Sequence, residues 1–123
     1  MERLVWWNGE FVKESEAKIS IYDSALMFGD MIFEMTRSFN KKQFKLREHL
    51  ERLYQSAKHI HLDIPITIDE MEQAVYDTIE ANEHLFGDDD EHRIMIDISR
   101  GLLGIYESNV RGVKPGPNVI IAD

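Results

Sequence analysis

The spacing of apolar residues changes twice along this chain of 123 residues, and that change restricts the folds it can adopt. Apolar and polar residues alternate in several segments on either side of residues 46–82, as they do in half-buried strands. Inside that range, Leu46, Leu50 and Leu53 begin a series with three- and four-residue spacing that continues to Ile60. This spacing predicts an amphipathic helix of about 13 residues.

A second helix is predicted after the first. Thr67-x-x-Glu70 is a capping-box pattern, in which each side chain can bind a backbone N–H at the start of a helix. Apolar residues continue at helical spacing to Ile79, so we expect this helix to end near Asn82. Strands, then two helices, then strands predict an α+β domain: a mostly antiparallel sheet with two main helices packed on it.

The strands are marked by alternation and by turn residues. Asn8-Gly9, inside residues 3–12, is a strong signal for a tight hairpin between two short strands. Another turn is expected at residues 40–42, and the glycines and prolines of residues 101–117 predict an irregular segment. Further strands are expected at residues 17–22, 31–39, 43–46, 93–99 and 119–122.

Charge and composition argue against several classes of function. The formal net charge is −9 at pH 7, which disfavours nucleic acid and anionic membrane surfaces as partners, because both attract basic footprints. The chain has no cysteine, which removes disulfides, thiolate catalysis and cysteine-bound zinc. The apolar run at residues 4–7 is too short for a signal peptide or a membrane span. We therefore expect a cytoplasmic protein.

Single residues taken alone assign no chemistry. His59 and His61 lie two apart near the end of the first helix, so surface histidines are favoured over a metal site. Arg52 lies beside the apolar stripe of that helix, where an arginine more often extends its charge into water than binds an anion. Arg37 and Arg93, on predicted strands, are more often surface residues than substrate clamps.

Short motifs follow one another along nearly the whole chain. They are Trp7-Asn8-Gly9-Glu10, the segment Ser24 to Asp30, Phe33-Glu34 with Arg37, the segment Phe44 to Leu53 with Ser56-Ala57, and Ser99-Arg100-Gly101. Each motif is weak alone, but the ordered set resembles the class IV aminotransferases. That family is the fold-type IV group of pyridoxal-phosphate enzymes, which includes branched-chain aminotransferases, D-amino-acid aminotransferases and aminodeoxychorismate lyases.

The resemblance implies a domain, a cofactor and a set of site residues. In the family, pyridoxal 5'-phosphate binds between a small N-terminal domain and a larger C-terminal domain, and residues 1–123 resemble the small domain. Arg52 matches the arginine that reaches the cofactor phosphate, a role that suits its permanent charge and two-point donation. Phe28, Phe33, Arg93 and Ile105 match substrate-binding positions, and the position of Ile105 contacts the pocket of the neighbouring subunit.

The resemblance also implies the reaction and its partners. An aminotransferase passes an amino group between an amino acid and a 2-oxo acid, so both are expected as partners, and the family implies a homodimer. The apolar residues 102–105, together with Phe28, suit a branched-chain or other hydrophobic side chain. Ile105 and Glu107 occupy the positions of the Arg-x-His carboxylate trap of D-amino-acid enzymes. A D-amino-acid aminotransferase and an aminodeoxychorismate lyase remain the alternative enzymes.

In this family, the lysine that carries the cofactor as a Schiff base and the carboxylate beside its pyridine nitrogen come from the C-terminal domain. No lysine of this chain lies in a matching motif; the lysines are Lys13, Lys18, Lys41, Lys42, Lys45, Lys58 and Lys114. We therefore expect no catalytic residue within residues 1–123. Because the chain ends directly after a predicted strand, we expect it to be part of a longer protein. The alternative is a free-standing, non-catalytic binding or dimerisation module.

Overall fold

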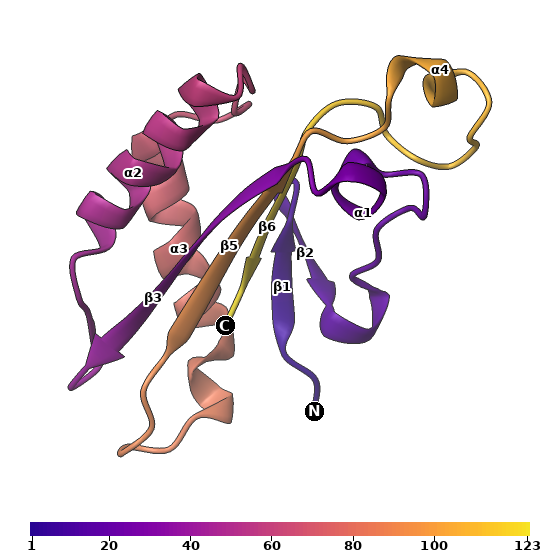
Figure 1. The fold of residues 1–123 in the computed structure, drawn as a ribbon. Helices are drawn as coiled ribbons and strands as arrows, with labels where there is room; N and C mark the ends of the chain where they lie inside the picture. The colour runs from indigo at the N-terminus through magenta and orange to yellow at the C-terminus, as the bar shows by residue number, and fades with distance from the viewer.

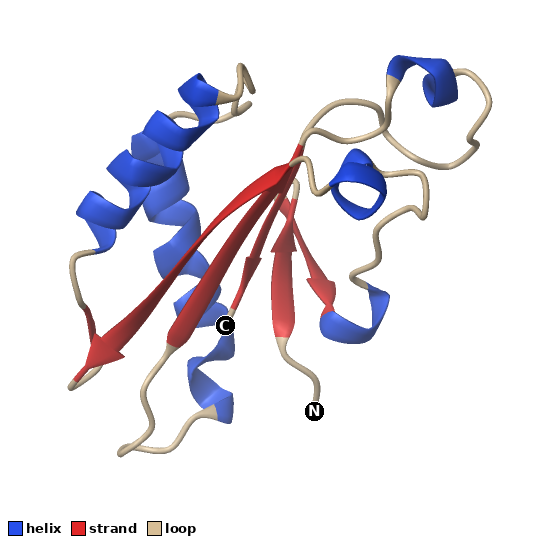
Figure 2. Ribbon diagram, in the orientation of Figure 1, coloured by secondary structure: helices blue, strands red, loops and turns tan.

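The computed structural model describes residues 1–123, which form a six-stranded sheet with two long helices on one of its faces (Figure 1, Figure 2). The strands are β1 (Leu4–Trp7), β2 (Glu10–Lys13), β3 (Met31–Phe39), β4 (Lys42–Gln43), β5 (Arg93–Ser99) and β6 (Asn118–Ala122). The helices are α1 (Ser24–Phe28), α2 (Leu46–His59), α3 (Ile68–Asn82) and α4 (Gly104–Glu107), with 3-10 turns at Glu14–Glu16 and Glu83–Leu85. The predicted α+β class is confirmed.

The strand order in the sheet is β2-β1-β6-β5-β3-β4, and every neighbouring pair is antiparallel. The last strand of the chain, β6, therefore lies inside the sheet between β1 and β5. The longest strand, β3, pairs with β5 along seven residue pairs, from Met31 opposite Ser99 to Arg37 opposite Arg93. This long pairing fixes which residues of β3 face the helices.

The core lies between the sheet and the helices α2 and α3. Alternate residues of β5, Ile94, Ile96 and Ile98, are fully buried and meet Leu50 and Leu53 of α2. The other members of this cluster are Leu46, Ala57, Leu62, Met71, Ala74, Val75, Val119 and Ile121. The apolar residues that recur at every second position in the strands and at every third or fourth position in the helices thus face the same core layer. In Figure 1 the opposite face of the sheet carries no long helix.

Both long helices begin where their sequence signals place them. Thr67 precedes α3, and its hydroxyl accepts a hydrogen bond from the Glu70 N–H at 3.2 Å while the Glu70 carboxylate accepts from the Thr67 N–H at 3.0 Å. The predicted capping box is therefore confirmed. α2 begins at Leu46 directly after Lys45, whose backbone is left-handed with φ of 53°. No helix of the chain combines the length and the apolar character that crossing a bilayer requires.

Two strand predictions were wrong. Residues 17–22 alternate in sequence but form no strand, because the 3-10 turn at Glu14–Glu16 leads the chain away from the edge strand β2. Ile19 lies against the sheet face that the long helices leave open, whereas Ile21 is 68% exposed. The strand predicted at residues 43–46 is shorter and earlier, at Lys42–Gln43, because Leu46 already belongs to α2.

Leu53→Ala tests the importance of the layer between α2 and the sheet. The Leu53 side chain is fully buried, so we expect the variant to lose roughly 2–5 kcal/mol of unfolding free energy through lost burial and the cavity it leaves. Urea denaturation measures this loss. The exposed neighbour Gln55→Ala serves as the control and should change stability by less than about 0.5 kcal/mol. Similar losses in both variants would contradict the placement of the core.

Candidate active site

Two of the sequence motifs meet between β3 and α2. Alternation along β3 turns Phe33 towards the open face of the sheet and Glu34 towards the helices. His49 and Arg52 lie three residues apart on α2, so they share a helix face. Arg52 Nε and Nη2 donate to the two carboxylate oxygens of Glu34 at 2.7 Å each, and His49 Nδ1 lies 2.8 Å from Glu34 Oε1. The Phe-Glu and His-x-x-Arg motifs therefore form one polar cluster.

The charges of this cluster are matched. Glu34 is only 5% exposed, whereas the side chain of Arg52 is 68% exposed. The hydrogen bonds from Arg52 lower the pKa of the Glu34 carboxyl; burial alone would raise it, and the contact with His49 lowers it further. Glu34 is therefore an ionised carboxylate beneath a guanidinium that is open to solvent.

Arg52 keeps donors that no other group of the chain engages. A guanidinium carries five N–H bonds, and Glu34 accepts from Nε and Nη2, so Nη1 makes no hydrogen bond. A hollow of about 340 Å³ lies here, lined by Lys45, Glu48, His49 and Arg52. Free guanidinium N–H groups beside a second cation suit a phosphate group, which guanidinium binds through short charge-assisted hydrogen bonds.

The Phe-Gly-Asp and Ser-Arg-Gly motifs meet at the other end of β3. Arg100 Nε donates to Asp30 at 2.6 Å, and its Nη2 donates to the backbone oxygen of Ile60, beyond the end of α2, at 2.6 Å. Gly101 has φ of 90°, and a Cβ at this position would lie 2.0 Å from the backbone oxygen of Gly116. These motif residues therefore hold together the loops around the end of the sheet.

Phe28 and Ile105 lie at the end of the molecule that carries α1 and α4 (Figure 1). Both side chains are open to solvent, with exposed fractions of 66% and 70%. The two segments that carry them are connected by Tyr22 and Tyr106, whose rings stack with centroids 5.0 Å apart. The predicted substrate residues Phe28 and Ile105 thus belong to one exposed end of this chain.

Phe33 and Arg93 share the open face of the sheet. Phe33 is 63% exposed and lies opposite Asp97, an unpaired carboxylate whose pKa burial raises. Arg93 lies directly opposite Arg37, and the two line a hollow of about 420 Å³ with Arg3. Arg37 has Glu91 3.9 Å away, whereas Arg93 makes no ion pair. Glu91 and Asp123 line the same hollow, so carboxylates balance part of its positive charge, and Arg93 is the arginine of the opposed pair without an ion-pair partner.

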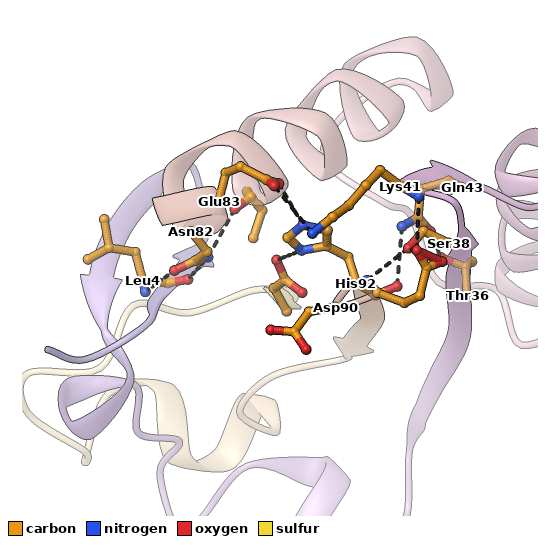
Figure 3. Close-up of polar contacts among 12 residues, drawn as sticks. Leu4, Thr36, Ser38, Lys41, Gln43, Asn82, Glu83, Asp90 and His92 are labelled. Atoms are coloured by element: carbon orange, nitrogen blue, oxygen red, sulfur yellow. Dashed lines mark hydrogen bonds and ion pairs between the residues drawn. The ribbon is translucent and has the colours of Figure 1, made fainter. Parts of the chain in front are cut away.

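The cluster around His92 carries no sequence motif, and the sequence analysis missed it. His92 is fully buried, and its Nε2 lies 2.6 Å from the carboxylate of Glu83 at the end of α3 (Figure 3). Its Nδ1 lies 2.6 Å from the carboxylate of Asp123 after β6. The backbone N–H of His92 donates to Ser38 of β3 at 2.8 Å. The partners are 9 to 54 residues away in sequence, so no local pattern predicts them. The cluster connects α3, β3, β5 and the chain end.

The five predicted site residues lie in three places on this chain. Arg52 lies on α2 above the helix-facing side of β3, Phe33 and Arg93 lie on the open face, and Phe28 and Ile105 lie at the α1–α4 end. The hollow lined by Arg52 and the hollow lined by Arg93 each contain none of the other four predicted residues. The roles of the five residues stay predictions.

Comparison with known proteins identifies the family. The sequence model of the family described as amino-transferase class IV matches residues 31–121. D-alanine aminotransferase from Staphylococcus haemolyticus is 36% identical over 111 residues, which are 90% of this chain and 34% of that protein. A protein from Methanocaldococcus jannaschii, provisionally named a branched-chain-amino-acid aminotransferase, is 44% identical over 78 residues, which are 63% of this chain and 27% of that protein.

Solved structures agree with this result. The branched-chain aminotransferase from Thermoproteus uzoniensis superposes with a TM-score of 0.79 at 34% sequence identity, covering 99% of this chain and 40% of that chain. The branched-chain amino acid aminotransferase from Escherichia coli gives a TM-score of 0.81 at 30% identity, covering 99% and 40%. This chain belongs to the class IV aminotransferase family. It spans about a third of the length of the curated relatives it matches.

Acid should weaken the contribution of the Glu34 cluster to stability. The pKa of Glu34 in the folded chain lies below its ordinary value of 4.5, so its ionised form stabilises the fold above that value. This contribution is lost as pH falls through the lowered pKa. We expect the unfolding free energy of the wild type to fall further than that of Glu34→Gln between about pH 7 and about pH 3, measured by urea denaturation.

Glu48→Gln is the control for this comparison. Glu48 is an exposed carboxylate on the same helix face with no hydrogen bond or ion pair, so its substitution should leave the acid loss of the wild type unchanged. If the wild type and Glu34→Gln lost the same unfolding free energy in acid, the ionised Glu34 would not be stabilised by Arg52 in the folded chain.

Proposed function

We propose that residues 1–123 are the small N-terminal domain of a pyridoxal-phosphate-dependent aminotransferase, and that Arg52 binds the phosphate of the cofactor. The observation that carries this proposal is the pairing of Arg52. Glu34 engages its Nε and Nη2, while Nη1 and the solvent-exposed part of the guanidinium have no partner. Two further solved structures of a similar branched-chain amino acid aminotransferase, 30% and 29% identical to this chain, hold pyridoxamine 5'-phosphate or a phosphopyridoxyl adduct of L-glutamate.

The residues present fit the phosphate end of this cofactor. Arg52 and Lys45 both line the hollow beside α2 and supply positive charge there, as an anionic group requires. When bound, pyridoxal phosphate supplies an electron sink that lets an amino acid exchange its α-proton and amino group. We assign the lysine and the pyridine-side carboxylate that this chemistry needs to a C-terminal domain outside residues 1–123. Within this chain, Arg52 anchors and orients the cofactor.

The proposed substrates are a branched-chain or other hydrophobic amino acid and a 2-oxo acid. Arg93 has no ion-pair partner and lies beside Arg37, so it can hold a carboxylate, and Phe33 adds an apolar surface on the same face. Phe28 and Ile105 are exposed at the α1–α4 end, from which we propose that they reach the pocket of the second subunit. D-alanine is the second candidate donor, because a D-alanine aminotransferase matches 90% of this chain.

A homodimer in the cytoplasm completes the proposal. Large apolar side chains are exposed at the α1–α4 end and on the open face of the sheet, and exposed apolar surface often marks an interface with further protein. They include Leu26, Met27, Phe28, Phe33, Met35 and Ile105. We propose that the C-terminal domain and a second subunit cover these surfaces. The cytoplasmic assignment rests on the absence of cysteine.

Arg52→Ala in the full-length protein tests the phosphate assignment. Charge-assisted hydrogen bonds to phosphate would be lost, so we expect the dissociation constant for pyridoxal 5'-phosphate to rise roughly 10- to 100-fold. Arg47→Ala is the control, because Arg47 lies on the same helix but pairs with Asp69 and Glu72 of α3. Titration followed by cofactor absorbance measures both constants. Equal weakening by the two substitutions would reject Arg52 as the phosphate ligand.

A donor panel on the same protein tests the substrate proposal. We expect kcat/KM for L-leucine to exceed that for D-alanine, because Leu102, Leu103 and Ile105 are apolar and residues 105–107 hold no Arg-x-His trap. Formation of the matching 2-oxo acid measures each rate. A higher kcat/KM for D-alanine would favour the second candidate and remove the branched-chain proposal.

A further inference from the structure

Glu34 has no role in the function proposed so far, although it is the residue that contacts Arg52. We propose that Glu34 is a positioning residue for cofactor binding: it holds the Nε and Nη2 edge of Arg52 so that Nη1 is presented to the phosphate. This inference rests on the proposed function, since it takes Arg52 as the phosphate ligand. Phosphate binding would then depend on the carboxylate of Glu34, which does not itself contact the cofactor.

The geometry of the pair supports this role. An exposed arginine samples many side-chain conformations, but Arg52 makes two parallel hydrogen bonds of 2.7 Å to the two oxygens of one carboxylate. Two parallel bonds fix both the position and the plane of the guanidinium group. The side chain of Arg52 is 68% exposed, so the packing around it is too sparse to do the same.

Glu34 can hold Arg52 because Glu34 is itself held. Its side chain is nearly buried, and its backbone pairs with Ile96 in the middle of the long ladder between β3 and β5. His49 Nδ1 lies 2.8 Å from Oε1, which therefore has two partners. A carboxylate fixed by a strand and a second side chain is a rigid support for a mobile arginine.

Charge alone predicts the opposite effect. Glu34 is ionised and close to the proposed phosphate, so neutralising it should strengthen phosphate binding if electrostatic repulsion dominates. If positioning dominates, the same change should weaken phosphate binding. Glu48 separates the two effects, because it lines the same hollow but forms no hydrogen bond or ion pair with Arg52. Glu48→Gln therefore removes a nearby negative charge without freeing the arginine.

The test compares pyridoxal 5'-phosphate with pyridoxal, which lacks the phosphate, on the full-length protein. The ratio of the pyridoxal dissociation constant to that of pyridoxal 5'-phosphate, measured by absorbance titration, reports the contribution of the phosphate alone. We expect Glu34→Gln to lower this ratio by about tenfold with little change in the pyridoxal constant. Glu48→Gln should keep the ratio or raise it. An unchanged or higher ratio in Glu34→Gln would overturn the inference. If Glu34→Gln weakened the binding of pyridoxal and of pyridoxal 5'-phosphate equally, Glu34 would have only a structural role.

Arg52→Lys gives an independent test should Glu34→Gln not fold. Lysine keeps the positive charge but has no planar edge for two parallel bonds, so we expect the ratio to fall as it does in Glu34→Gln. If Arg52→Lys kept the wild-type ratio of the two dissociation constants, the positioning role would be overturned. Arg52→Ala separates the phosphate assignment of Arg52 from the positioning role of Glu34. An unchanged ratio in Arg52→Ala would reject the phosphate assignment itself. A lower ratio in Arg52→Ala with an unchanged ratio in Glu34→Gln would reject only the positioning role.

Discussion

The ion pair between Glu34 and Arg52 connects the two halves of this fold. A carboxylate in the layer between sheet and helices is stable only if a cation and further hydrogen bonds match it. Arg52 and His49 supply them from α2, so the register of β3 and the rotation of α2 must agree. The requirement to satisfy one buried charge therefore determines where an exposed guanidinium lies.

The family motifs divide into two physical groups. One group builds the scaffold: Arg100 and Asp30 join the end of β5 to the loop before β3, and Gly101 allows the close approach of the loop at Gly116. The other group leaves donors free, as Arg52 does at Nη1. A family motif can therefore be structural or available for a ligand, and its hydrogen bonds distinguish the two.

Local patterns in the sequence predicted most of the elements. The helices were predictable because Leu50 and Leu53 repeat at helical spacing and Thr67 with Glu70 caps α3. Residues 17–22 were not, since alternation says nothing about whether a strand edge is within reach. The family resemblance singled out Arg52, but its partner Glu34 and the buried His92 cluster depend on contacts distant in sequence.

A structure of the full-length protein with pyridoxal 5'-phosphate bound tests the central claim most directly. We expect a phosphate oxygen about 2.8 Å from Arg52 Nη1, with both hydrogen bonds from Arg52 to Glu34 intact. A phosphate bound away from Arg52, or an Arg52 that leaves Glu34 to reach it, would contradict the claim that the Glu34 pair presents this arginine to the cofactor.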